Sequence, residues 1–121
     1  MCDYCDCRTR PSIAAFGSDH ERIGSLLHEL EQGGDPSALL ELLEAHSLRE
    51  EAGLYTELAA AGVDVSELSD EHAQIHAGLR HGDPAAATAL RSHIHAEEYD
   101  LFPAAHQVLD HAAWDRVDAT G

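Results

Sequence analysis

Histidine and glutamate recur at helical spacing in two stretches of this 121-residue chain. His46 and Glu50 stand four residues apart, as do His93 and Glu97, and each pair is followed by a second glutamate and then by leucine and an aromatic residue. Four residues make about one turn of a helix, so each imidazole faces the same point as its carboxylate. Because imidazole and carboxylate bind iron, zinc and other transition metals, the two stretches predict metal chemistry.

A second repeated pattern makes the chain a doubled unit. Asp19-His20 precedes the first stretch and Glu71-His72 precedes the second, and each is followed by an isoleucine three residues after the histidine. Two facing units would hold two metals with two carboxylates between them. His76 adds a third imidazole one turn after His72, whereas Gly24 stands at the corresponding place in the first unit. The expected ligands are therefore His72, His76 and His93 on one metal, His20 and His46 on the other, and Glu50 and Glu97 between the two.

The punctuation of the sequence predicts the helices that carry these residues. Gly34-Asp35-Pro36 and Gly82-Asp83-Pro84 each combine a residue that ends a helix with residues that begin one. The breaks predict helices over 12–32, 36–61, 66–81 and 84–108, with a bend or an end at Pro103. Short connections make successive helices antiparallel neighbours, so we expect an all-α, up-down-up-down four-helix bundle over 12–108. A Cys-rich segment, 1–11, precedes it, and a tail, 109–121, adds a turn or two around Trp114.

The candidate ligands lie inside the apolar stripes of these helices. Leu43 precedes His46 by three residues, and Leu90 precedes His93 in the same way. A carboxylate buried in a bundle core is costly unless it is paired or bound to metal. Neutral imidazoles cannot neutralise Glu50 and Glu97, whereas two cations can.

These motifs, in this order on four predicted helices, resemble the hemerythrin-like or HHE cation-binding domains of the bacterial stand-alone type. The resemblance implies an oxo- or hydroxo-bridged pair of iron ions that binds dioxygen. It also implies that Leu90 lines the oxygen pocket. Either Glu97 or Glu98 could bridge the irons, and the symmetry with His46 and Glu50 favours Glu97.

Two further features carry open alternatives. Tyr55, little more than a turn beyond Glu50, could ligate a metal, donate a hydrogen bond, supply an electron or simply fill an end of the bundle. Cys2, Cys5 and Cys7 could hold an extra metal with a fourth ligand, form a disulfide with one thiol left over, or stay reduced.

The charge of the chain limits its partners. Seven basic residues against 23 acidic ones give a net charge of −16, which argues against nucleic acids and anionic membranes. No apolar run is long enough to span a membrane, and the N-terminus does not have the pattern of a signal peptide, so a cytoplasmic protein is expected. The acidic surface favours a monomer or a dimer.

The residues leave three functions open. The first is a protein that binds dioxygen or nitric oxide at the iron pair. The second is a catalase or peroxidase that consumes hydrogen peroxide at the same centre. The third is an iron-handling protein that oxidises and stores iron.

Overall fold

A computed structural model describes residues 10–120, in which every regular element is a helix and no strand occurs. The elements in chain order are α1 (Pro11–Glu31), α2 (Ser37–Glu50), η2 (Glu51–Tyr55), α3 (Thr56–Ala60), α4 (Ser66–Arg80), α5 (Pro84–Ala96), η3 (Glu97–Leu101), α6 (Phe102–Val108) and α7 (His111–Thr120). The elements η2 and η3 are π-helical turns, and each continues the α-helix before it without a break. The expected all-helical class is therefore confirmed, and Cys2, Cys5 and Cys7 lie outside the described residues.

The glycine-containing breaks end the helices where the sequence predicts. Gly33 and Gly82 have φ angles of 93° and 72°, a left-handed conformation that glycine adopts without a steric penalty. The Asp83 side chain accepts a hydrogen bond from the backbone N–H of Ala85 at 3.0 Å and so caps α5. Asp35 accepts one from the Ser37 N–H at 2.8 Å at the start of α2. These contacts stop one helix and start the next within a few residues.

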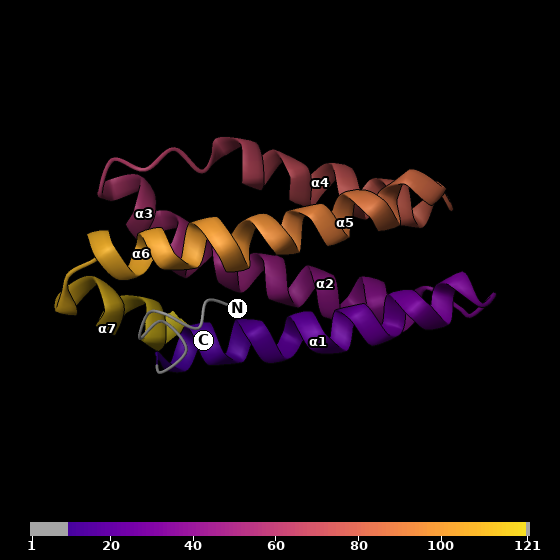
Figure 1. Ribbon diagram of the computed structural model, residues 1–121, viewed down its shortest axis with the longest axis horizontal. Coiled ribbons are helices and arrows are strands. Elements are labelled where there is room, and N and C mark those ends of the chain that lie inside the picture. Colours follow the sequence, from indigo (N-terminus) through magenta and orange to yellow (C-terminus); the bar gives the residue numbers. More distant parts are fainter. Residues whose placement is uncertain (1–9, 121) are drawn as a thin grey trace.

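The four long helices run side by side and are neighbours in a ring (Figure 1). α1 contacts α2 and α5, and α4 likewise contacts α5 and α2. Successive long helices point in opposite directions in this view. Every long helix therefore has two neighbours, and the side chains that face inward from all four meet along the middle.

The interior consists of two apolar clusters. One surrounds Trp114 and Phe102 and includes Ile13, Leu54 and Leu58. The other contains Ile23, Leu27, Leu39, Leu43, Ile75, Leu79 and Leu90. Along α1, His20 lies between Phe16 of the first cluster and Ile23 of the second, so a polar layer separates the two. Burying an apolar side chain contributes about 1.5–3 kcal/mol, and the clusters hold the polar layer from both sides.

Most of the described part of the tail forms a helix, α7, that covers one end of the molecule (Figure 1). Trp114 is fully buried in the first apolar cluster, and Val117 packs beside it. The Ser12 hydroxyl donates a 2.6 Å hydrogen bond to Asp118, and Arg116 forms an ion pair with Glu57 at 2.8 Å. The apolar face of α7 packs on the first cluster, which explains why the helix in the tail is longer than the turn or two predicted from the sequence.

Pro103 does not end the helix predicted over 84–108, because α6 continues past it to Val108. Proline has no N–H to donate to the carbonyl four residues earlier, and the chain accommodates it in the first turn of α6, two residues after the π-helical turn η3 ends. Within residues 10–120, no helix combines the length and the apolar composition needed to cross a membrane.

Candidate metal centre

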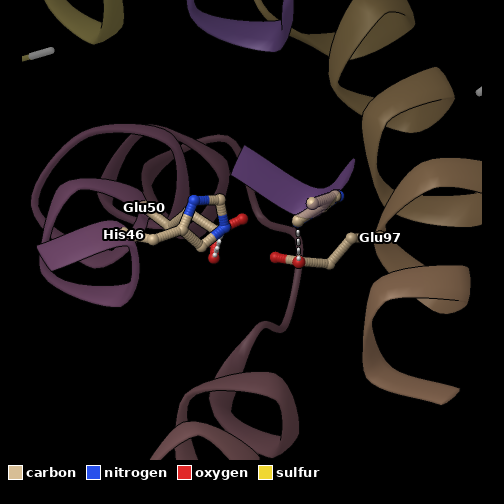
Figure 2. A group of neighbouring side chains, drawn as sticks. His46, Glu50 and Glu97 are labelled. Atoms are coloured by element: carbon tan, nitrogen blue, oxygen red, sulfur yellow. Dashed lines mark ion pairs between the residues drawn. The ribbon is translucent and has the colours of Figure 1, made fainter. Parts of the chain in front are cut away.

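Six buried side chains form the polar layer between the apolar clusters. The central histidines are His20, His46, His72 and His93, and the central carboxylates are Glu50 and Glu97. Figure 2 shows His46 and Glu50 on α2 reaching toward Glu97, which comes from the opposite side of the layer. Both central carboxylates have 0% exposure, so water does not solvate either charge.

Each central carboxylate faces two histidines from two different helices. Oε1 of Glu50 lies 3.1 Å from Nε2 of His46 and 3.3 Å from Nε2 of His72. Oε1 of Glu97 lies 3.2 Å from Nε2 of His20 and 3.5 Å from Nε2 of His93. All four helices thus place an imidazole nitrogen beside a carboxylate oxygen at the same level of the molecule.

Most of these inward atoms have no hydrogen-bond partner. The unpartnered buried atoms include both oxygens of Glu50, Oε1 of Glu97 and the Nε2 atoms of His20, His46 and His93. Among residues 10–120, the ion pairs of arginine go to Asp19, Glu31 and Glu57, not to the central carboxylates. A buried polar atom without a partner costs about 1–3 kcal/mol, and a buried charge costs more. A cation among these atoms would remove that cost.

The geometry divides the six side chains into two overlapping groups of possible ligands. One group contains His20 and His46, the other contains His72 and His93, and Glu50 and Glu97 belong to both. Within each group the ligand atoms lie within 4.8 Å of one another. Each group therefore offers two imidazoles and two carboxylates, and two cations held there would share both carboxylates.

A second layer of acidic residues contacts the other nitrogen of three central histidines. Nδ1 of His46 lies 2.8 Å from Asp19, Nδ1 of His20 lies 2.9 Å from Glu98, and Nδ1 of His93 lies 3.0 Å from Glu71. Nδ1 of His72 lies 3.8 Å from Glu51, which is too long for a hydrogen bond. We call Asp19, Glu51, Glu71 and Glu98 the outer carboxylates.

Three of the outer carboxylates, Asp19, Glu71 and Glu98, orient the imidazoles that they contact. When Nδ1–H donates to a carboxylate, the ring is held in one orientation and Nε2 carries the free lone pair toward the centre. Arg49 also pairs with Asp19 and so helps to fix the partner of His46. This arrangement is typical of histidines that bind metal, and it was not foreseen from the sequence. The available signal was that each outer carboxylate stands directly beside a central residue in the chain, as in Asp19-His20 or Glu50-Glu51.

Tyr55 contacts the layer from η2. Its hydroxyl donates a 2.6 Å hydrogen bond to Oε2 of Glu97 and lies 3.4 Å from Nε2 of His72. Its ring stacks on the imidazole of His72, with centroids 5.3 Å apart. Of the roles that the sequence left open, the structure shows the hydrogen-bond donor. The outer tyrosine, Tyr99, is 54% exposed and stacks on His95 instead.

Both π-helical turns lie beside the central carboxylates. η2 begins at Glu51, directly after Glu50, and η3 begins at Glu97 itself. A π-helical turn contains an extra residue, which changes the direction of the side chains that follow. Such turns occur frequently at functional sites. Here Tyr55, the last residue of η2, and Phe102, the first residue after η3, each stack on a central histidine.

The pKa shifts follow from two central carboxylates that are buried close together. Burial raises the pKa of Glu97 well above its usual range, and the nearby Glu50 raises it further. Burial alone would lower the pKa of His20, but its contacts with Glu97 and Glu98 outweigh burial and raise that pKa to about 9. Burial, together with the central carboxylates, also raises the pKa of Tyr55, so the phenol keeps its proton at neutral pH.

The remaining candidates lie near the layer but not all within it. Leu90 is 1% exposed and lines a small cavity of about 10 Å³ with the six central side chains, Ile23, Leu43 and Ile94. Glu98 lies outside the two groups, on Nδ1 of His20. His76 belongs to neither group; it is half-buried, and its Nε2 has no hydrogen-bond partner.

The six central side chains could hold metal ions, since they combine buried, unpartnered donor atoms with a net negative charge. Comparison of the chain with protein families, with curated proteins and with solved structures gave no match.

Proposed function

We propose that this protein holds two iron ions between Glu50 and Glu97 and binds dioxygen or a related small ligand, such as peroxide or nitric oxide, at that centre. The proposal includes the hemerythrin-like, up-down-up-down four-helix bundle that the sequence resembles. The observation that supports it most strongly is the pair of overlapping groups, each with two imidazoles and two shared buried carboxylates. The arrangement favours two cations, because a single ion in one group would leave the two imidazoles of the other group without a metal.

The donor set favours iron. Imidazole and carboxylate together suit iron, whereas thiolates would favour copper(I) or an iron–sulfur cluster. Each group supplies four ligand residues, so an octahedral ion keeps positions for a bridging oxygen and for a small ligand. An iron pair supplies two electrons in reactions with dioxygen or peroxide.

The residues of the chain contribute three things to this chemistry. The outer carboxylates on His20, His46 and His93 hold those imidazoles with Nε2 directed inward. The apolar side chains of Leu90, Ile23, Leu43 and Ile94 line the small space around the centre, which leaves no room for large molecules. Tyr55 holds a proton 2.6 Å from Oε2 of Glu97. The small cavity favours small ligands over larger substrates.

A second function, the removal of hydrogen peroxide, is favoured by Tyr55. A catalase reduces one hydrogen peroxide to two molecules of water and oxidises a second one to dioxygen, with two protons moved between the two. A buried phenol beside the centre can give and recover such a proton, and proton transfer by a positioned side chain contributes about 10²–10⁴-fold to a rate. Iron storage is the weaker candidate, because the described layer has room only for ions held by its own ligands.

The test is to express the protein with ample iron and to measure iron per chain, the spectrum in air and under vacuum, and gas evolution with hydrogen peroxide. We expect two irons per chain. A charge-transfer band that vacuum removes supports ligand binding, and rapid oxygen release with the iron retained supports the peroxide-consuming enzyme. A correctly folded protein without bound metal would overturn the proposal. Glu41→Gln, which changes an exposed carboxylate on α2, should bind iron like the wild type and so serves as the control for substitutions of the central carboxylates.

A further inference from the structure

A groove of about 420 Å³ lies between α2 and α4, outside the six central side chains. It is lined by Glu44, Ser47, Leu48, Glu51, Ser69, His72, Ala73, His76, Ala77, Arg80 and His81. Glu44, Ala73, Ala77 and His81 are exposed, so the groove is open at the surface of the protein. His72 is only 8% exposed and also belongs to the central layer. One imidazole therefore separates the groove from the centre.

Two imidazole nitrogens beside this groove lack partners. Nδ1 of His72 and Nε2 of His76 are both buried without a hydrogen bond. The nearest outer carboxylate, Glu51, lies 3.8 Å from Nδ1 of His72, whereas the other three central histidines contact theirs at 2.8–3.0 Å. His72 is thus the central histidine whose outer nitrogen is held least, and its ring is the one that the groove reaches.

The equivalent place in the other half of the molecule is built differently. Gly24 stands one turn after His20, where His76 stands one turn after His72, and Glu98 holds Nδ1 of His20 at 2.9 Å. The central carboxylates have 0% exposure, so an ion from solvent must pass the side chains that cover them. His72, whose Nδ1 lacks a hydrogen bond, is the central histidine that lines an open groove and so offers a passage.

The chemistry of the groove fits a cation. Unpartnered imidazole nitrogens present lone pairs, and carboxylates supply the opposite charge. Two carboxylates, Glu44 and Glu51, line the groove together with one guanidinium, that of Arg80. The donors of His76 and Glu51 do not form a group as compact as those of the centre. A cation would therefore be held there weakly enough to move on.

We propose that this groove is the loading site of the centre, where His76 and Glu51 first hold a ferrous ion that then passes His72 to reach the central carboxylates. This role rests on the proposed function, since it requires a two-metal centre to be filled. It differs from the role predicted from the sequence, in which His76 stays a permanent ligand of one metal. His76 acts during uptake and is free of metal when loading is complete.

The test follows the uptake of metal by the full chain after a chelator has removed its metal. The chain is mixed with cobalt(II) or, without oxygen, with ferrous iron, and the rate and the final metal content are measured for wild type, His76→Ala and Glu51→Gln. We expect both variants to load at least about tenfold more slowly and to reach the same final content as wild type. His76→Glu, which restores a ligand, should recover most of the rate. His28→Ala is the matched control, because His28 is an exposed histidine on α1, away from the groove.

Two outcomes would overturn the loading site without affecting the proposed function. If His76→Ala and Glu51→Gln load as fast as wild type, the ion enters elsewhere. If His76→Ala binds one metal fewer than wild type, His76 is a permanent ligand of the centre. Failure of the wild type to bind two metals would instead overturn the proposed function.

Discussion

The two halves of the molecule, residues 11–55 and 66–102, carry the same central residues but differ around one of them. In each half the acidic residue before the first histidine contacts the second histidine: Asp19 reaches His46, and Glu71 reaches His93. Across the halves, Glu50 faces His72, and Glu97 faces His20. The central layer is therefore nearly two-fold symmetric, and the repeated motif of the sequence explains why.

The differences gather around His72. Tyr55 stacks on His72, whereas Phe102 stacks on His20 in the same manner, with centroids 5.9 Å apart. The phenol oxygen of Tyr55 thus has no counterpart in the other half. His76 and the long contact to Glu51 belong to the same region. Under the proposed function, the comparison separates two tasks: the symmetric residues would bind metal, and the asymmetric ones would control access and protons at one side.

The largest expected effect comes from the residues that both groups share. Glu97→Ala should abolish binding of both metals, because Glu97 contributes to each group, whereas His20→Ala should weaken only one. Metal analysis of the purified variants checks this. Retention of two metals by Glu97→Ala would contradict the shared-carboxylate arrangement.

The halves should also differ in their response to pH when metal is removed. The pKa of His20 is raised to about 9 from 6.5, so its contribution to stability is complete below pH 6.5 and is lost as the pH rises through 9. The raised pKa of Glu97 acts in the same direction. Burial lowers the pKa of His93, so its contribution is already complete above pH 6.5 and does not change in this window.

Metal-free protein should therefore lose up to about 3 kcal/mol of unfolding free energy between pH 6.5 and 9. Denaturant unfolding at several pH values measures the loss, and metal-loaded protein serves as the control with a flat profile. A metal-free protein that becomes more stable over this range would show that His20 is not held by its carboxylates as described.

Tyr55→Phe makes the two halves alike at their stacked aromatic rings. The substitution removes the hydrogen bond to Glu97 and leaves the ring on His72 in place. We expect unchanged metal content and peroxide turnover reduced about a hundredfold, because the proton donor is lost. Steady-state oxygen release measures the rate. Tyr99→Phe, at an exposed tyrosine, is the matched control, and equal turnover in all three proteins would remove Tyr55 from the chemistry.

The smallest effect distinguishes two outer carboxylates. Glu98→Gln weakens a 2.9 Å contact to His20 and should reduce metal affinity about tenfold, as replacing a residue that orients a ligand commonly does. Glu51→Gln weakens only a 3.8 Å contact and should change equilibrium affinity much less, even though it slows uptake. Competition with a chelator gives both affinities. A larger loss of affinity in Glu51→Gln would reverse the assignment of the two residues.

The sequence predicts the helices and the central residues well because both follow from local rules. Glycine with positive φ at Gly33 and Gly82 ends helices, and Asp83 starts the next one. The spacing of His46 and Glu50 places both on one face of a single helix, independent of its neighbours. Buried His20, His46, His72 and His93 follow from the apolar stripes.

The features that the sequence did not reveal depend on neighbouring helices. Glu98 on η3 contacts His20 on α1, and the residue pattern within a single helix cannot predict a contact between two helices. The π-helical turns η2 and η3 require an extra residue that is tolerated only in the packed structure. His76 has the spacing of a ligand, but it lies one turn beyond His72, about 6 Å further along α4. At that level Ile75 and Leu79 fill the inward face of the helix.

The central claim is that Glu50 and Glu97 are buried together because two cations lie between them. Crystals grown with ferrous iron and measured at the iron absorption edge test this directly. We expect two anomalous peaks per chain, one beside His20 and His46 and one beside His72 and His93, with Glu50 and Glu97 reaching both. A well-ordered protein with no peak between the two carboxylates, or with its iron only in the groove at His76, would contradict the claim.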